Sequence, residues 1–242
     1  MSGLIYKEFV QNRKFLLILM GCILFMSLMI FADDSNADAE TKSMLLTFVE
    51  SIAHISAFIF LNIVQPEFIK ADESKKWVYF AVSAPKGAAD IVRAKYIFIL
   101  AVNVLTNILC YMTDGICSAV TGVAVDGTLA MIAAFYVNIF LSSIDMLFIM
   151  RFGSKAGQIY RSALLFVVLF AGAVYGLFGD LSIFGSPDTI AEKFVNFISS
   201  ENIPSGLILF MGVFPFVSAA MYYASYRLSC KLYVKGADNF EG

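Results

Sequence analysis

Charged residues are scarce in this sequence, and histidine is scarcer still. Only 15% of the 242 residues are Asp, Glu, Lys or Arg, 60% are hydrophobic, and there is one histidine. Soluble domains are typically about 45–50% apolar and about 25% charged. This composition excludes an ordinary soluble globular fold, so the hydrophobic residues need another environment.

Several catalytic and binding motifs are also absent. The sequence has no G-x-x-x-x-G-K-[ST] loop for a nucleotide, no H-E-x-x-H and no G-x-S-x-G. The four cysteines show no C-x-x-C or Cys/His spacing, and His54 alone cannot supply two imidazole ligands. Asp114 and Asp145 lie at opposite ends of their predicted helices, which argues against an aspartyl dyad. The sequence thus predicts no enzyme, no metal site, no disulfide framework and no cofactor bound by this chain.

The hydrophobic residues are grouped in long runs. They are about twenty residues long, enough for a helix to cross roughly 30 Å of hydrocarbon. Lipid offers no partner for an open backbone, so these runs have to be helical. We expect an all-α integral membrane protein with one transmembrane domain, residues 1–242, and a second span that ends at Pro66. The six predicted spans are about 15–32, 44–65, 97–119, 129–150, 162–179 and 206–226.

Two segments outside the spans have amphipathic patterns. On a helical wheel of residues 1–14, apolar and polar side chains fall on opposite arcs. The apolar arc holds Ile5, Tyr6, Phe9 and Val10, and the polar arc holds Lys7, Glu8, Gln11 and Asn12. This pattern favours an interfacial helix in the headgroup plane, with a plain cytosolic lead-in as the alternative. Residues 180–205 repeat apolar side chains every four positions, which predicts a helix-bearing extracellular loop.

The distribution of basic residues predicts the orientation of the chain. With the N-terminus inside, the inner segments hold fifteen of the seventeen Lys and Arg residues, and the outer loops hold only Lys42 and Lys193. Basic residues are retained on the cytoplasmic side of a membrane. We therefore expect a multi-pass protein of the plasma membrane with both termini cytoplasmic.

Residues 67–96 form the longest polar interval and contain the only tryptophan. Acidic Asp72 and Glu73 are followed by basic residues, the charge order of a helix start. Pro85 disfavours helical conformation at the residue before it. The segment therefore predicts a cytoplasmic helical hairpin between spans 2 and 3. Its basic residues suit either a cytoplasmic partner or anionic lipid headgroups.

The sequence DESKKWVYFAVSAPKGAADIVRAKY in this hairpin resembles the signature of bacterial ABC-2-type permeases. In that family an acidic-basic-Trp run leads to P-S-R-x-x-I-V-x-x-K-Y. The matching residues are Asp72, Glu73, Lys75, Trp77, Pro85, Ile91, Val92, Lys95 and Tyr96, with one residue more between Pro85 and Ile91 than in that pattern. The family's Ser-Arg after the proline is Lys86-Gly87 here. The chain is most similar to small permeases of Gram-positive peptide exporters, such as those for phenol-soluble modulins or antimicrobial peptides.

This resemblance implies an ABC-2, type V exporter-like permease fold in a bacterial cell membrane, without an ATPase of its own. Two copies, or this chain and a sister permease, would pair as a homo- or heterodimer. Each would seat residues 67–96 on a separate ABC ATP-binding subunit, which would carry ATP and Mg. The contact residues would be Glu67, Asp72, Glu73, Lys75, Lys76, Trp77, Pro85 and Lys86. The implied cargo is an amphipathic peptide or other amphiphile, and no nucleic acid is implied.

Polar residues inside the predicted spans are a second group of candidates. They are Glu50, His54, Asn103, Asn107, Asn138 and Asp145. An ionised group at the bilayer centre costs about 2.5–3.5 kcal/mol, so such side chains face the bundle or a wet cavity. They would either line a translocation path or hydrogen-bond helices to one another. We expect Arg151 to neutralise Asp145, and we expect Asp114 to be hydrated near the outer end of its helix.

Two other functions fit the same residues. One is a non-transporting sensor or immunity module that binds its partner through residues 67–96. The other is an ion-coupled secondary carrier that uses Glu50 and His54. Carriers are often built from internal repeats, and the two halves of this chain show no convincing similarity.

Overall fold

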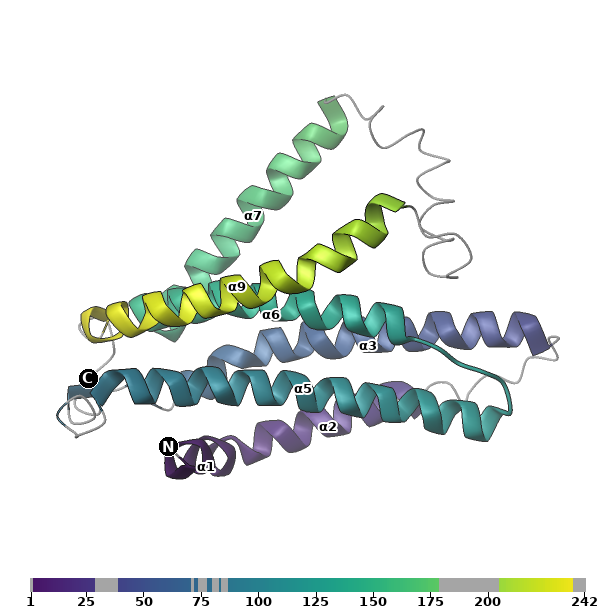
Figure 1. The fold of residues 1–242 in the computed structure, drawn as a ribbon, viewed down its shortest axis with the longest axis horizontal. Coiled ribbons are helices and arrows are strands. Elements are labelled where there is room, and N and C mark those ends of the chain that lie inside the picture. Colours follow the sequence, from purple (N-terminus) through teal and green to yellow (C-terminus); the bar gives the residue numbers. More distant parts are fainter. Residues whose placement is uncertain are drawn as a thin grey trace.

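The computed structural model describes residues 2–28, 39–70, 72–73, 78–79, 83, 87–178 and 205–236. Every element in this part of the chain is an α-helix, which confirms the all-α prediction there. The helices are α1 (Ser2–Gln11), α2 (Arg13–Leu28), α3 (Ala39–Lys70), α5 (Gly87–Thr121), α6 (Thr128–Phe152), α7 (Ser154–Phe178) and α9 (Ser205–Gly236) (Figure 1). The predicted helix of the loop 180–205 lies outside the described residues, apart from Ser205 at the start of α9.

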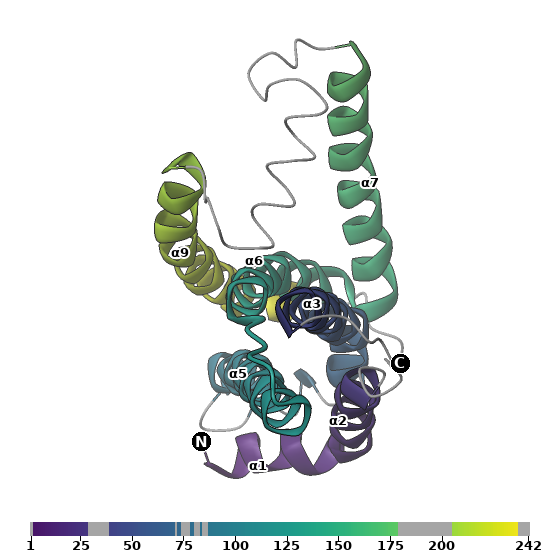
Figure 2. The ribbon, with the colours of Figure 1, turned by 90° about the vertical axis from the view of Figure 1, so that its right-hand side faces the viewer.

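Helix α6 is the centre of the bundle, because it packs against α3, α5, α7 and α9. Seen end-on, α1, α2, α3 and α5 group on one side of α6, and α7 and α9 diverge on the other (Figure 2). Helix α1 and the C-terminal end of α9 lie at the same end of the molecule (Figure 1). We refer to it as the α1 end.

Among the described residues, three helical stretches are long and apolar enough to cross a membrane: Glu40–Lys70, Gly87–Thr121 and Thr128–Phe152. They contain the predicted second, third and fourth spans. The spans predicted at 15–32, 162–179 and 206–226 stay predictions, as does the total of six.

Beside its apolar core, this bundle buries charged side chains and exposes large apolar ones. The side chains of Glu50, His54 and Lys95 lie inside, at 1% exposure or less, whereas Phe166 and Phe216 are 68% and 77% exposed. Lipid solvates apolar side chains but not charged ones, so this is the arrangement that a membrane bundle requires. The burial pattern agrees with the membrane setting predicted from composition.

The predicted second span ends at Pro66, and helix α3 itself continues to Lys70. A proline has no N–H to donate to the carbonyl four residues earlier, which here belongs to Asn62. That carbonyl instead accepts a hydrogen bond from Arg161 Nη1 of α7, at 3.5 Å. Because the freed acceptor finds a partner on a neighbouring helix, α3 can pass the proline.

Helix α1 occupies the segment predicted to be interfacial, but part of its polar arc faces the protein rather than water. Glu8 and Asn12 are 3% and 2% exposed, while the apolar-arc residue Tyr6 is 72% exposed. Glu8 lies against Lys95 of α5, and Asn12 donates to the carbonyl of Phe68 in the last turn of α3. The polar arc therefore attaches α1 to the bundle.

Only parts of the predicted hairpin belong to the described residues. Asp72 and Glu73 follow α3, Val78 and Tyr79 are helical, and α5 begins at Gly87. The φ angle of Gly87 is 62°, a left-handed conformation that favours glycine. The predicted break at Pro85 lies outside the described residues, and the hairpin itself stays a prediction.

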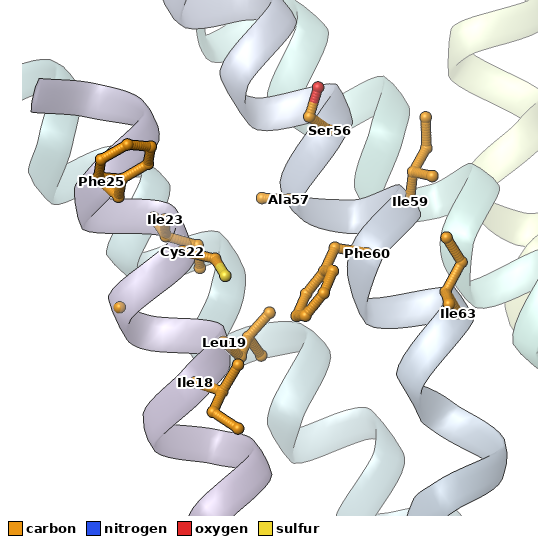
Figure 3. Close-up of a pocket in the computed structure, with 11 residues that line it drawn as sticks. Ile18, Leu19, Cys22, Ile23, Phe25, Ser56, Ala57, Ile59, Phe60 and Ile63 are labelled. Atoms are coloured by element: carbon orange, nitrogen blue, oxygen red, sulfur yellow. The ribbon is translucent and has the colours of Figure 1, made fainter. Parts of the chain in front are cut away.

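An apolar cavity of about 470 Å³ separates α2 from α3 (Figure 3). It is lined by Ile18, Leu19, Gly21, Cys22, Ile23 and Phe25 of α2 and by Ser56, Ala57, Ile59, Phe60 and Ile63 of α3. Leu19 and Ile23 of α2 and Ala57 of α3 also belong to the buried apolar core, so the two helices remain in contact beside this cavity.

Candidate functional site

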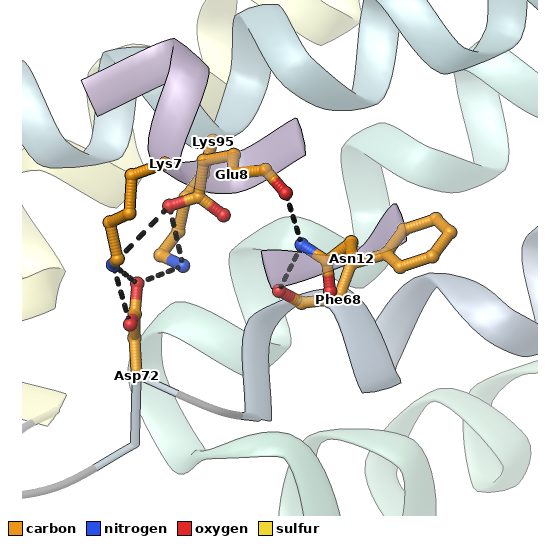
Figure 4. A network of polar contacts seen from close by, with 6 residues as sticks. All are labelled: Lys7, Glu8, Asn12, Phe68, Asp72 and Lys95. Atoms are coloured by element: carbon orange, nitrogen blue, oxygen red, sulfur yellow. Dashed lines mark hydrogen bonds and ion pairs between the residues drawn. The ribbon is translucent and has the colours of Figure 1, made fainter. Parts of the chain in front are cut away.

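Four charged side chains meet where residues 67–96 leave the bundle: Lys7, Glu8, Asp72 and Lys95, which we name the charge cluster (Figure 4). Lys7 Nζ lies 2.6 Å from both carboxylate oxygens of Asp72. Lys95 Nζ lies 2.7 Å from Asp72 Oδ2 and 3.4 Å from Glu8 Oε1. The cluster thus joins α1, the residues after α3 and the first turns of α5.

Asp72 is the acceptor that holds the charge cluster together. Burial raises its pKa, but the charge of Lys95 and the hydrogen bonds from Lys7 and Lys95 outweigh burial, so the net pKa is lowered. At Glu8, burial outweighs the attraction of Lys95, and the pKa is raised. Asp72 therefore stays ionised at neutral pH and attracts both lysines.

A layer of aromatic rings supports the charge cluster from within the bundle. Phe98 of α5 stands edge-on to Phe9 of α1 and to Phe68 of α3, with ring centroids 5.0 and 5.5 Å apart. Next to Asp72, Glu73 accepts a 2.6 Å hydrogen bond from Ser154, the first residue of α7. The start of residues 67–96 is thereby fixed to α1, α5 and α7.

The residues predicted to contact an ATP-binding subunit fall into three groups. Glu67 is partly exposed and pairs with exposed Lys70 at 3.1 Å. Asp72 is buried and Glu73 is partly buried, and both make contacts within the chain. The remaining five, Lys75, Lys76, Trp77, Pro85 and Lys86, lie outside the described residues.

Sequence reasoning missed Lys7, Glu8 and Lys95 as members of this site. The available signal was Lys95, a charged residue only two positions before a predicted span. Its partners could not be found from spacing, because Asp72 and Glu8 lie 23 and 87 residues away along the chain.

A groove of about 660 Å³ opens between α5, α6 and α9, and we name it the tyrosine groove. It is lined by Arg93, Tyr96, Ile97, Leu100, Tyr136, Ile139, Ala219, Tyr222, Tyr223, Tyr226 and Arg227. The Tyr96 hydroxyl lies 2.7 and 2.8 Å from the hydroxyls of Ser225 and Ser229, and Tyr222 donates to the Tyr96 carbonyl. These bonds fix the aromatic wall, whereas both arginines are exposed.

Three of the predicted intramembrane polar residues are hydrogen-bonded within the bundle. Asn138 donates to Asn103 at 2.6 Å, and both are buried. Asp145 pairs with Arg161 at 2.9 Å and not with Arg151, so that expectation was wrong. Arg161 approaches from α7, whereas Arg151 turns to the Lys235 carbonyl of α9. These contacts fit the role of joining helices.

Asn107 is partly buried, and Glu50 and His54 form a separate cluster with Asp114. The expectation that Asp114 is hydrated is wrong, because it is 5% exposed and faces His54 at 3.3 Å. The residues that cover it come from the turn before α6 and from α3, where His54 lies 60 residues away along the chain.

Comparison with known proteins gives one match. A family model described as ABC-2 family transporter protein matches residues 3–234. No curated protein and no solved structure matches this chain.

Proposed function

We propose that this chain, which belongs to the ABC-2 family of transporter proteins, exports an amphiphile with energy supplied by a separate ATP-binding subunit. The family assignment makes it a membrane component, a permease subunit and not the ATPase. The absence of a P-loop agrees with that division of labour. In this proposal the chain pairs with a second copy or with a sister permease.

The observation that carries the coupling proposal is the charge cluster at the root of residues 67–96. Lys7, Asp72 and Lys95 join α1, α3 and α5 through contacts of 2.6 and 2.7 Å. Buried charges held in this way resist separation, because leaving one unpaired is costly. A push on residues 67–96 by the ATP-binding subunit would therefore move the three helix ends as one body.

Affinity purification from the native membrane tests this coupling. The tagged chain is solubilised in a mild detergent, and co-purifying proteins are identified by mass spectrometry. A Glu67→Ala/Trp77→Ala double variant changes the predicted contact. Its matched control, Glu40→Ala/Met44→Ala, makes exposed substitutions at the opposite end of α3.

The proposal expects an ATP-binding subunit with the wild type and the control, and much less of it with the Glu67→Ala/Trp77→Ala variant. Co-purification that survives this variant unchanged would move the contact away from residues 67–96. Absence of any ATPase under conditions that preserve other transporter complexes would refute the two-subunit proposal.

The tyrosine groove supports an amphiphile as the cargo. Its wall combines aromatic and aliphatic side chains, while Arg93 and Arg227 lie towards the α1 end, where α5 begins and α9 ends. Guanidinium groups bind carboxylates and phosphates, and tyrosines contact both apolar and polar parts of a ligand. The groove therefore suits a molecule with an apolar body and an anionic group.

A further inference from the structure

Three polar side chains form a closed cluster at the end of the bundle opposite α1. Glu50 and His54 lie one turn apart on α3, and Asp114 lies on α5. Their exposures are 0%, 1% and 5%. Gly127, at the start of α6, closes the cluster on the side of the imidazole ring.

The turn between α5 and α6 is held over this cluster by contacts with α3. Ser43 donates to the Ala124 carbonyl at 2.5 Å, and the Asp126 amide donates to Thr47 Oγ1 at 3.3 Å. Beneath the turn, Leu46, Cys117 and Val125 form a small apolar cap. The cluster is thus enclosed by three elements that the chain brings together.

No polar side-chain atom of Glu50, His54 or Asp114 makes a hydrogen bond of normal geometry within the described residues. Backbone groups of Gly127 and Cys110 lie near His54, and the Gly127 backbone also lies near Asp114. Elsewhere in the bundle, Asn138 and Asn103 satisfy each other at 2.6 Å. An unsatisfied buried polar group costs about 1–3 kcal/mol, and more when it is charged. Three such groups that face one another indicate a binding site for a shared ligand.

The distances in the cluster fit a shared metal ion better than direct hydrogen bonds. His54 Nε2 lies 3.6 Å from Glu50 Oε2 and 3.3 Å from Asp114 Oδ1. Ordinary N–H···O bonds measure about 2.7–3.2 Å. Zinc bonds of about 2.0–2.1 Å in a tetrahedron place neighbouring ligand atoms about 3.3–3.4 Å apart. One ligand atom from each of the three residues lies within 4.8 Å of the others.

We infer that Glu50, His54 and Asp114 bind a divalent transition-metal ion of the zinc type. Two carboxylates supply two negative charges, which a divalent ion balances. An imidazole nitrogen with carboxylate oxygens suits zinc, whereas calcium and magnesium prefer oxygen ligands alone. Three protein ligands leave a fourth position for water. The ion would join α3 to α5 beneath the α5–α6 turn, a site that sequence motifs could not predict.

Gly127 gives this site a steric requirement that can be tested separately. A Cβ atom there would lie 2.8 Å from His54 Cε1 and Nδ1 and 3.4 Å from Asp114 Oδ1. The Gly127 backbone has φ −87° and ψ 8°, which alanine adopts without strain. An alanine would therefore act on the imidazole ring rather than on the turn.

The test is zinc binding by the full-length chain in lipid nanodiscs, after removal of bound metal with a chelator. Wild type should bind about one zinc ion per chain, and zinc should raise its unfolding temperature. Glu50→Gln and Asp114→Asn retain the side-chain shape but lose a ligand charge. Their zinc affinity should fall by more than the roughly 10–100-fold typical of outer-shell changes. Asp126→Asn, at an exposed carboxylate of the same turn, should bind zinc like the wild type.

A wild-type chain that takes up no zinc would overturn the inference. Zinc affinity of Glu50→Gln and Asp114→Asn equal to that of the wild type would overturn it too. If those two variants do not fold, the Gly127→Ala variant tests the site instead, and it should weaken zinc binding. Its control is Gly115→Ala, which has open space around its position and should leave zinc binding unchanged. Equal affinity of the two alanine variants would then reject the site. No ATP-binding subunit is needed, so the result is independent of the transport proposal.

Discussion

Lys95 is the residue on which the charge cluster depends most. It is 1% exposed and lies between the carboxylates of Asp72 and Glu8. Lys7, in contrast, is 32% exposed at its side chain, so water can stabilise part of its charge. Removal of Lys95 would leave two buried acids with one partly hydrated cation.

We expect Lys95→Met to destabilise the purified chain strongly. Breaking a buried ion pair by removing one partner costs about 3–5 kcal/mol. Lys70→Met is the matched control, because its pair with Glu67 is exposed, and such pairs contribute about 1 kcal/mol or less. Thermal unfolding in one detergent compares the two variants. Equal unfolding temperatures would show that the charge cluster contributes no more than a surface ion pair.

Residue types and their local spacing predicted part of this site. Asp72 and Glu73 stood out because they are followed by basic residues, the charge order of a helix start, and both lie where residues 67–96 leave the bundle. Lys7 was predicted only as part of a polar arc, since its contact with Asp72 spans 65 residues. A single sequence defines which residues are charged but not which of them meet.

At the scale of the element, Pro66 shows what hydropathy cannot define. The apolar run ends near this residue, and the sequence therefore predicted the end of the second span there. Helix α3 nevertheless continues four residues further, because Arg161 of α7 bonds to the carbonyl that the proline leaves free. Hydropathy indicates the part of a helix that lipid surrounds. The helix itself ends where its backbone N–H and C=O groups no longer find hydrogen-bond partners.

Pro66→Ala should stabilise α3 around residue 66 and weaken its contact with α7. Alanine restores the N–H, which can bond to the Asn62 carbonyl within the helix at a gain of about 0.5–1.5 kcal/mol. Arg161 keeps its bonds to Asn62 Oδ1 and Asp145, at 3.2 and 2.9 Å, but loses one acceptor. Hydrogen exchange should slow in peptides covering residues 62–70 and quicken at the start of α7. Faster exchange in residues 62–70 would mean that the proline itself rigidifies this turn.

Over the whole molecule, the two clusters of buried charged residues lie at opposite ends of the long helices. The charge cluster and the arginines of the tyrosine groove lie towards the α1 end, while Glu50, His54 and Asp114 lie towards the other. Composition predicted a membrane bundle and the side on which its basic residues collect. The tyrosine groove could not be predicted, because its lining comes from three helices spread over residues 93–227.

If an amphiphile enters through the tyrosine groove, its anionic group should contact Arg93 and Arg227. We expect an Arg93→Ala/Arg227→Ala variant to bind a fluorescent, negatively charged amphipathic peptide at least about tenfold more weakly, since hydrogen bonds to charged groups contribute about 1.5–3 kcal/mol each. Fluorescence polarisation in nanodiscs of zwitterionic lipid measures this. Arg13→Ala controls for general attraction, because Arg13 is an exposed arginine at the start of α2 and outside the groove. Equal weakening by Arg13→Ala would mean that the peptide responds to surface charge, and an unchanged double variant would place the cargo elsewhere.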